Sequence, residues 1–295
     1  MLIDRTDSNF SRPSRAILLF SCPDVKGIVA EVSHFIFTYN GNILRSNQHS
    51  DPETGTFFMR VEWDISEFTL PESKISRAFE PIAEKFSMDY RIEFSSRTSR
   101  IAIFVSKLDH CLYDLLLRNK EGEIPGEIVL IIGNHPDLKP VADYFHIPFH
   151  HVPVTPETRM DAEALELDLL SKANVDLVVL ARYMQILSPS FVETYRNRVI
   201  NIHHSFLPAF VGAKPYHQAF ERGVKIIGAT SHYVTEDLDQ GPIIEQDVVR
   251  VTHQDSVADM IQKGKNLERL VLSRAVKLHL EHKILVFGNK TIVFE

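Results

Sequence analysis

Short apolar runs alternate with amphipathic stretches over the first third of the chain, and their spacing predicts one element for each. Strands are predicted at residues 15–22, 42–51, 55–65 and 89–95, and helices at 24–40 and 72–86, the latter in spite of Pro81. The resulting order, βαββαβ, is that of the ferredoxin-like arrangement, in which two helices cover a four-stranded sheet. We therefore predict a complete small domain over residues 14–94.

The rest of the chain follows a different pattern. The polar segment SSRTSR at 95–100 has nothing apolar to bury and is the predicted linker to a second domain at 101–295. Strand-like runs such as EIVLIIGN and VDLVVLA are apolar without alternation, as in a sheet covered on both faces, and helical stretches lie between them. This predicts an α/β, Rossmann-like domain with a mostly parallel sheet. A helix at 257–281 and a hairpin around Gly288 and Asn289 are predicted to follow.

Composition narrows the class of protein. The chain has 295 residues, 44% of them hydrophobic and 24% charged, and it has no apolar run of the roughly 18 to 20 residues that a membrane span needs. Residues 1–15 carry no apolar segment behind their charges, so we expect no signal peptide, no membrane association and a cytoplasmic location. The two cysteines, Cys22 and Cys111, are too few for a disulfide framework. The net charge is −7 and the basic residues are scattered, so nucleic acid is not an expected partner.

Candidate chemistry appears where an apolar strand ends, in the stretch NIHHSFLP. Side chains alternate along a strand, so Asn201 and His203 are predicted to share a face at its carboxyl end, where open α/β sheets bind ligands. A capping role for the same two residues is the alternative. Further on, a loop between two β-rich runs carries Glu236, Asp237 and Asp239, and acidic residues on loops are more often simply solvated.

The two segments together resemble the formyltransferase-fold family that uses 10-formyltetrahydrofolate. The signature of that family is an Asn-x-His strand end, a Ser-(Leu/Phe)-Leu-Pro turn and a His-x-Val-x-x-x-(Leu)-Asp-x-Gly-Pro loop. It matches NIHHSFLPAFVGAKPYHQAF and GATSHYVTEDLDQGPII here. The resemblance implies that Asn201, His203 and Asp239 form the catalytic set.

A third segment, LARYMQILSPSFV, is similar to the strand and loop that form the folate pocket of this family. There, apolar side chains would wall the pterin while backbone groups pair with its amide edge; ordinary packing at a strand end is the alternative. The substrate contacts implied by the resemblance are Met184, Gln185, Ile186, Leu187, Val234 and Gly241.

The N-terminal domain resembles an ACT domain, an amino-acid-sensing module with the same βαββαβ order. Its Pro-Asp-x-x-Gly turn into a helix is present at Pro23, Asp24 and Gly27, and Gly27 would allow a close backbone approach by a ligand. The resemblance implies a regulatory site at Asp24 and Gly27, a small amino acid such as glycine or methionine as effector, and a homo-oligomer. A purely structural, dimerising role is the alternative.

Within the formyltransferase-fold family, the acceptor of the formyl group should leave marks on the sequence. Glycinamide ribonucleotide formyltransferases have a Gly-x-Gly-Ser-Asn loop that cradles phosphate, whereas this chain has KLDHC at 107–111. The chain ends too soon after Asp239 for the tRNA-binding or aldehyde dehydrogenase modules of other members. ACT-plus-formyltransferase chains with a KxxHC loop are formyltetrahydrofolate deformylases, and essentially the whole chain resembles them.

This resemblance implies a hydrolase that converts 10-formyltetrahydrofolate to formate and tetrahydrofolate, supplying formate for purine biosynthesis and balancing the one-carbon folate pool. The folate is the substrate, and no cofactor or metal is expected. Two alternatives remain: a glycinamide ribonucleotide-type formyltransferase, and a catalytically silent regulator that binds folate or an amino acid. A single assay of formate release without acceptor would separate them.

In the expected mechanism, Asn201 donates to the tetrahedral oxyanion and His203 stabilises it and passes a proton toward N10. Asp239 would either hold the attacking water as a base or orient His203. The second histidine of the motif, His204, has no predicted role, and it points away from the substrate if the strand alternation persists.

Overall fold

The computed structural model describes residues 14–208 and 215–295, which form two compact units, one ending at Arg97 and the other beginning at Thr98. Two expectations fall partly outside the described residues. They are the absence of a leader, which rests on the N-terminal residues, and the part of the NIHHSFLPAFVGAKP motif at 209–214. Among the helices of the described residues, none combines the length and the apolar character that a membrane span requires.

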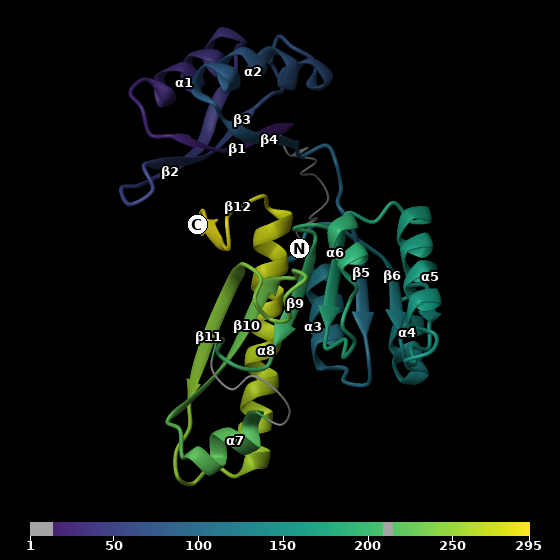
Figure 1. Cartoon of the computed structure of the whole chain (residues 1–295). Coiled ribbons are helices and arrows are strands. Elements are labelled where there is room, and N and C mark those ends of the chain that lie inside the picture. Colours follow the sequence, from purple (N-terminus) through teal and green to yellow (C-terminus); the bar gives the residue numbers. More distant parts are fainter. Residues whose placement is uncertain (1–13, 209–214) are drawn as a thin grey trace, which may run out of the picture. The chain divides into compact units, whose positions relative to one another are not determined.

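The first unit has the predicted βαββαβ order (Figure 1). Its elements are β1 (Arg15–Pro23), α1 (Ile28–Thr38), β2 (Asn42–Asp51), β3 (Thr56–Asp64), α2 (Glu72–Phe86) and β4 (Asp89–Phe94). The strands form an antiparallel sheet in the order β2-β3-β1-β4, and α1 and α2 lie side by side on one face of it. Alternate residues of β3, such as Trp63, enter an aromatic-rich core under these helices together with Phe20 and Phe79.

Helix α1 begins later than the sequence predicted. The apolar spacing suggested a helix from residue 24, but the backbone at Gly27 is left-handed, with φ of 98°, and the first helical residue is Ile28. A left-handed residue cannot continue a right-handed helix, and glycine tolerates it because it lacks a Cβ. The segment from Asp24 to Gly27 is therefore an exposed loop in front of the helix.

The second unit is built on one seven-stranded sheet in the order β11-β10-β9-β8-β5-β6-β7. The strands are β5 (Arg100–Val105), β6 (Glu127–Gly133), β7 (Phe149–His151), β8 (Leu177–Ala181), β9 (Val199–His203), β10 (Ile226–Tyr233) and β11 (Ile243–Arg250). Strands β7, β6, β5, β8 and β9 are parallel to one another. Strands β10 and β11 are each antiparallel to their neighbours, so the expectation of a mostly parallel sheet is confirmed. The chain leaves β5 toward β6 on one side and returns to β8 on the other, which opens a crevice at the carboxyl ends of the central strands.

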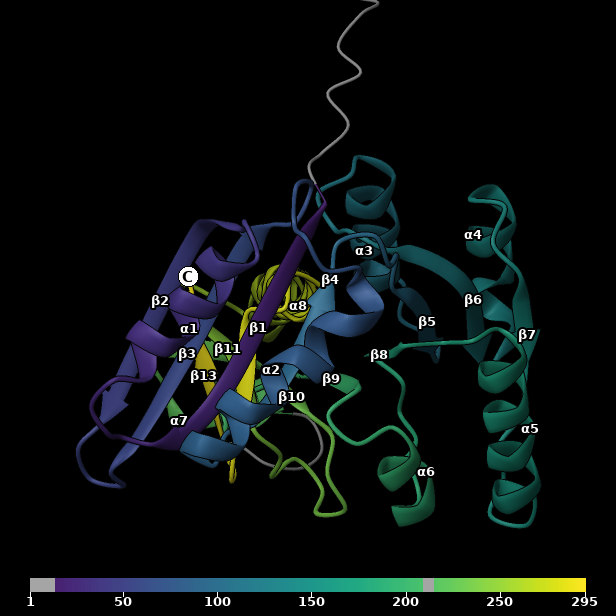
Figure 2. The same cartoon turned by 90° about the horizontal axis from the view of Figure 1, so that it is seen from above.

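Helices cover both faces of this sheet, as the unbroken apolar strands predicted. The helical elements are α3 (His110–Lys120), η1 (Pro136–Leu138), α4 (Lys139–Tyr144), α5 (Arg159–Lys172), α6 (Pro189–Thr194), α7 (Pro215–Arg222) and α8 (Val257–Leu280). One face, which includes Ile101 and Ile103 of β5, packs against α3, α4 and α8; the other, which includes Phe104, packs against α5 and α6. Figure 2 views α8 end-on, with α3 beside it.

The second unit begins with a strand and ends with a hairpin. Arg100 was expected in the linker but is the first residue of β5, where its side chain donates to the carbonyl of Ala173 and its backbone N–H donates to Asp176. At the other end, β12 (Ile284–Phe287) and β13 (Lys290–Val293) form the predicted antiparallel hairpin.

Candidate active site

A cavity of about 270 Å³ lies at the carboxyl ends of β8 and β9. The loop after β10 closes one side of it, and the loop after β8 forms another. The residues that line it are Leu180, Arg182, Tyr183, Met184, Gln185, Ile186, Leu187, Asn201, Ile202, His203, His204, His232, Val234, Thr235, Glu236, Leu238 and Asp239. The three residues implied as catalytic are therefore brought together from β9 and a loop 36 residues further on.

His203 is the most constrained of the three. Its ring is buried, and Nδ1 lies 3.2 Å from Oδ2 of Asp239, so an N–H at Nδ1 donates to the carboxylate. In the neutral ring this leaves a lone pair on Nε2. That atom is buried and has no hydrogen-bond partner among the described residues. Buried polar atoms are seldom left unpaired, so Nε2 is the atom available to a substrate or to water in the cavity.

Asp239 is suited to holding His203 in place. The hydrogen bond from His203 holds the pKa of the Asp239 carboxyl well below its ordinary value, although burial acts in the opposite direction. The carboxylate is therefore ionised at physiological pH. A carboxylate with a strongly lowered pKa is a weak base, so this contact favours the orienting role over the role of base for water.

The loop that carries Asp239 is fixed by its backbone. Asp239 itself has a left-handed backbone, with φ of 57°, which few residues other than glycine and asparagine or aspartate adopt. Gly241 was expected to contact the substrate, but it is not among the residues that line the cavity. A Cβ at Gly241 would lie 1.8 Å from the carbonyl oxygen of Tyr233, so glycine is needed there for the loop to pack against the end of β10.

A fourth polar residue of the site, His232, was not singled out from the sequence. It lies directly opposite Asn201 in the antiparallel pair of β9 and β10, and directly opposed residues share a face. Its Nδ1 is 2.9 Å from the carbonyl oxygen of Tyr233, and its Nε2 is 3.3 Å from Nδ2 of Asn201. An Nδ1–H that donates to the carbonyl leaves Nε2 to accept from the Asn201 amide. His232 therefore orients Asn201, while its Nε2 is 3.6 Å from Asp239, too far for a strong hydrogen bond.

The implied folate wall does line the cavity. Met184 and Ile186 are more than half exposed, at 60% and 55%, while Leu187 is buried. Exposed apolar side chains beside a cavity favour an apolar ligand surface. Two of the backbone groups are already engaged: the N–H of Met184 donates to Ser106, and the carbonyl of Ile186 accepts from Arg159. Those two groups hold the loop in shape, so pairing with a pterin would fall to other backbone groups.

His204 does not point away from the site. Strand β9 ends at His203, so the alternation that would have turned His204 to the opposite face does not continue. Instead the two rings stack, with centroids 5.1 Å apart and an angle of 29° between their planes, and His204 lines the cavity. Burial and, to a lesser extent, the nearby charge of Arg182 lower the pKa of His204 to about 4. His204 is therefore a neutral ring at physiological pH.

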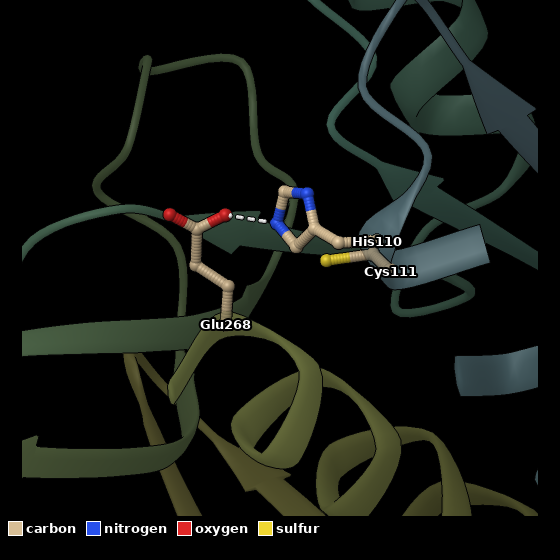
Figure 3. A group of neighbouring side chains, drawn as sticks. All are labelled: His110, Cys111 and Glu268. Carbon is tan, nitrogen blue, oxygen red and sulfur yellow. Dashed lines mark hydrogen bonds and ion pairs between the residues drawn. The ribbon is translucent and has the colours of Figure 1, made fainter. Parts of the chain in front are cut away.

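Behind His204 lies a second group of polar residues, centred on Glu268 of α8. His110 Nε2 is 2.7 Å from Oε2 of Glu268, and the hydroxyl of Tyr216 donates to Oε1 at 2.9 Å (Figure 3 shows the first contact). Arg182 Nε lies 3.6 Å from Oε2. Burial opposes ionisation of Glu268, but the hydrogen bond from His110 and the charge of Arg182 outweigh it and lower the pKa of this carboxyl.

His110, Cys111 and Glu268 are also the group of described residues whose ligand atoms, all within 4.8 Å of one another, come nearest to a metal site (Figure 3). Their surroundings do not favour a cation. Both oxygens of Glu268 already accept hydrogen bonds, and the guanidinium of Arg182 stands beside them. His110 and Cys111 open α3, where the helix dipole is positive, and burial raises the pKa of the Cys111 thiol, which disfavours the thiolate that a metal needs.

The implied regulatory residues lie in the first unit. Asp24 and Gly27 are exposed on the loop before α1, and the N–H of Asp24 donates to the carbonyl of Gly55. A Cβ added at Gly27 would meet nothing within 4 Å, so the space beside its backbone is open. Both cysteines of the chain are buried and unpaired.

Comparison with known proteins agrees with this architecture. A family model described as "Formyl transferase" matches residues 99–276, which is most of the second unit. Over 279 residues the chain is 55% identical to a formyltetrahydrofolate deformylase of Synechocystis sp., and the match covers 95% of this chain and 98% of that protein.

Two solved structures show how far the similarity extends. A formyltetrahydrofolate deformylase from Pseudomonas syringae superposes with a TM-score of 0.94 at 49% identity, covering 97% of this chain and 96% of that one. A glycinamide ribonucleotide transformylase from Symbiobacterium toebii superposes with a TM-score of 0.64 at 31% identity and covers 68% of this chain, although it is itself covered over 97% of its length. The likeness to the first extends over both units.

Proposed function

The chain belongs to the formyl transferase family and, within it, to the formyltetrahydrofolate deformylases, and from this premise we propose that it hydrolyses 10-formyltetrahydrofolate to formate and tetrahydrofolate. The chain is thus a hydrolase of a C–N amide bond. The single observation that supports the catalytic assignment is the buried, unpartnered Nε2 of His203, a residue that lines the cavity and whose Nδ1 is held by Asp239.

The proposed reaction uses His203 as the proton carrier. Its Nε2 takes a proton from a water molecule as the water oxygen attacks the formyl carbon, and the carboxylate of Asp239 stabilises the charged ring. When the C–N10 bond breaks, the same atom returns the proton to N10. Such a positioned acid and base contributes about 10²- to 10⁴-fold to a rate.

Asn201 is assigned to the oxyanion. Its amide nitrogen has two hydrogens, of which one is directed to His232 and the other remains for the tetrahedral oxygen. Loss of one such donor costs about 10²- to 10³-fold in turnover by comparison with other oxyanion holes. Met184, Gln185, Ile186, Leu187 and Val234 are proposed to hold the folate, the substrate of the reaction.

The released formate would supply purine biosynthesis, and removal of 10-formyltetrahydrofolate would balance the one-carbon folate pool. Neither a cofactor nor a metal is needed for the steps described, and the absence of both stays a prediction. The cytoplasmic location also stays a prediction.

The experiment that tests the function measures formate released from 10-formyltetrahydrofolate with no acceptor present. One formate is expected for each tetrahydrofolate formed, and in ¹⁸O-water each formate should carry one solvent oxygen. Addition of glycinamide ribonucleotide should leave the rate unchanged. A reaction that requires the ribonucleotide would restore the transferase alternative, and no turnover under either condition would restore the silent regulator.

For the first unit we propose a regulatory role through a small amino acid bound near Asp24 and Gly27, in a homo-oligomer. The exposed loop and the open space beside the left-handed Gly27 support a ligand that approaches the backbone closely. The structural, dimerising role remains the competing proposal, and binding measurements separate the two.

A further inference from the structure

A deformylase must admit water to the formyl carbon and keep other nucleophiles out, since any amine in the same place would be formylated instead. The catalytic residues do not themselves make this choice, because the same proton transfers serve an amine. The choice must lie with the groups that bound the space around the free Nε2 of His203.

Neighbouring side chains occupy two sides of the His203 ring. Its Nδ1 edge faces Asp239, and the cavity extends from it toward the apolar residues assigned to the folate, such as Met184 and Val234. The ring face is covered by His204, whose ring lies 5.1 Å away and nearly parallel. Arg182, which also lines the cavity, carries the charge that acts on His204.

Tyr216 lies next to His204. The ring centroid of His204 is 6.3 Å from that of Tyr216, and the Tyr216 hydroxyl is held by Glu268. Glu268 is 2% exposed and is itself held by His110 and faced by Arg182. Through Tyr216 the neighbourhood of His204 is connected to α3, α7 and α8. Tyr216 cannot swing aside without leaving an oxygen of the buried Glu268 carboxylate unpaired.

The side chain of Tyr216 occupies the space that Gly264 leaves open because it has no side chain. A Cβ at Gly264, in the middle of α8, would lie 2.0 Å from the Tyr216 hydroxyl oxygen and 2.2 Å from Cζ. Glycine inside a helix costs about 1 kcal/mol relative to alanine, so its presence here needs a reason in packing. The space it leaves lets the tyrosine hydroxyl reach Glu268, one turn further along the same helix.

We propose that His204, positioned by Tyr216 and the Glu268 network, is the residue that determines acceptor specificity: it fills the space beside His203 that a nucleophile larger than water would occupy. The proposal rests on the deformylase function stated above, and it identifies His204 as the side chain that restricts the reaction to hydrolysis. It assigns the buried His110–Glu268–Tyr216 group a positioning role and not a metal-binding one.

If His204 no longer filled this space, an amine could take the formyl group in place of water, and no further reagent would be needed. The nitrogen of an added amine forms a bond to the formyl carbon, the C–N10 bond breaks, and the proton lost by the amine passes through His203 Nε2 to N10. The products are the formylated amine and tetrahydrofolate, in place of formate and tetrahydrofolate.

The test measures how the formyl group is divided between water and an added small amine, with hydroxylamine as the probe. The wild type should give formate alone at all hydroxylamine concentrations. His204→Ala should give formylhydroxylamine in proportion to hydroxylamine, with a product ratio at least tenfold above the wild-type detection limit. His204→Phe refills the space with a ring and should return the ratio to that of the wild type.

Tyr216→Phe tests the supporting network, because it removes only the hydroxyl that reaches Glu268. A smaller rise in the product ratio than for His204→Ala is expected. Tyr183→Phe is the matched control: Tyr183 also donates its hydroxyl to a buried carboxylate, Glu166, at 2.8 Å, but it lies on the folate side of the cavity. Its product ratio should stay that of the wild type, whatever happens to its rate.

The outcomes distinguish a failure of the proposed function from a failure of the role given to His204. If the wild type releases no formate, the proposed function fails. If it releases formate but His204→Ala keeps the wild-type ratio, only the specificity role of His204 is overturned. A ratio that changes equally in the Tyr183 control would likewise overturn it, since loosening of the cavity in general would then explain the result.

Discussion

The adjacent residues His203 and His204 lie beside charges of opposite sign. His203 has a carboxylate at one ring nitrogen, whereas His204 is partly buried beside the positive charge of Arg182. The sequence placed His203 in the site by strand alternation and by family resemblance. It could not place His204, because the direction of that side chain depends on β9 ending one residue earlier.

The burial of His204 has a consequence for stability. In the unfolded chain an imidazole takes up its proton near pH 6.5, about the ordinary value, whereas in the folded chain His204 does so only near pH 4. Between these values the unfolded state binds more protons, so the free energy of unfolding falls as the pH is lowered through this window. The expected loss is on the order of 1 to 3 kcal/mol.

His204→Phe should remove that loss. Thermal unfolding of the wild type and the variant, measured at pH 7.5 and at pH 4.5, should show a smaller fall in Tm for the variant. The exposed His217→Phe, on α7, serves as a control and should behave as the wild type does. Equal falls in Tm for the wild type and His204→Phe would contradict the low pKa of His204.

Glu166 is expected to act in the opposite direction. Burial raises its pKa to about 7, so the folded chain holds a proton that the unfolded chain loses near pH 4.3, about the ordinary value for glutamate. Its contribution to the free energy of unfolding is therefore full below the unfolded pKa and falls as pH rises through about 7. Glu166→Gln keeps an oxygen for the hydroxyl of Tyr183, so its Tm should exceed that of the wild type at pH 8 by more than it does at pH 5. No change in this difference would contradict the raised pKa.

At the scale of the elements, the sequence predicted most strands and helices because apolar periodicity is a local property. It did not predict the pairing register that sets His232 opposite Asn201, since register depends on residues that are 31 positions apart in the chain. The family signature of the loop begins with His232, and this was the sequence signal of its role. The late start of α1 was missed for a different reason: apolar spacing does not reveal a left-handed glycine.

The loop between β10 and β11 has no regular secondary structure, and the close packing of Gly241 against Tyr233 sets its path. Gly241→Ala should displace this loop, because a Cβ would collide with the backbone carbonyl of Tyr233. A displacement of about 1 Å at Asp239 should lower turnover by about 10²-fold while the folate KM changes little. Steady-state kinetics would measure this, with the exposed neighbour Gln240→Ala as the control that should stay near the wild type. Wild-type turnover in Gly241→Ala would show that the loop has no such constraint.

At the scale of the molecule, the chain combines a small βαββαβ unit with an α/β unit of the formyltransferase fold. The order of elements and the covered, mostly parallel sheet could be read from the sequence, because unbroken apolar strands require helices on both faces. The buried Arg182–Glu268 contact could not, since the two residues are 86 positions apart and neither stands in a recognisable pattern.

If the first unit is regulatory, the rate of formate release should depend on the amino acid that this unit binds. Glycine or methionine at millimolar concentration should change the rate of formate release and should bind in calorimetry. Gly27→Ala should weaken this response, whereas Gly122→Ala in the second unit, also left-handed and also with open space beside it, should keep it. No binding and unchanged kinetics in the wild type would leave the unit a structural role.

In the proposed mechanism Asp239 acts through His203 and not as an independent base. A double-mutant cycle of single-turnover formate release tests this most directly, with His203→Ala, Asp239→Asn, the double variant and the wild type. Residues that act as one unit are strongly non-additive, so the double variant should be no slower than His203→Ala alone. Losses that multiply in the double variant would show that Asp239 activates the water itself and would contradict the account.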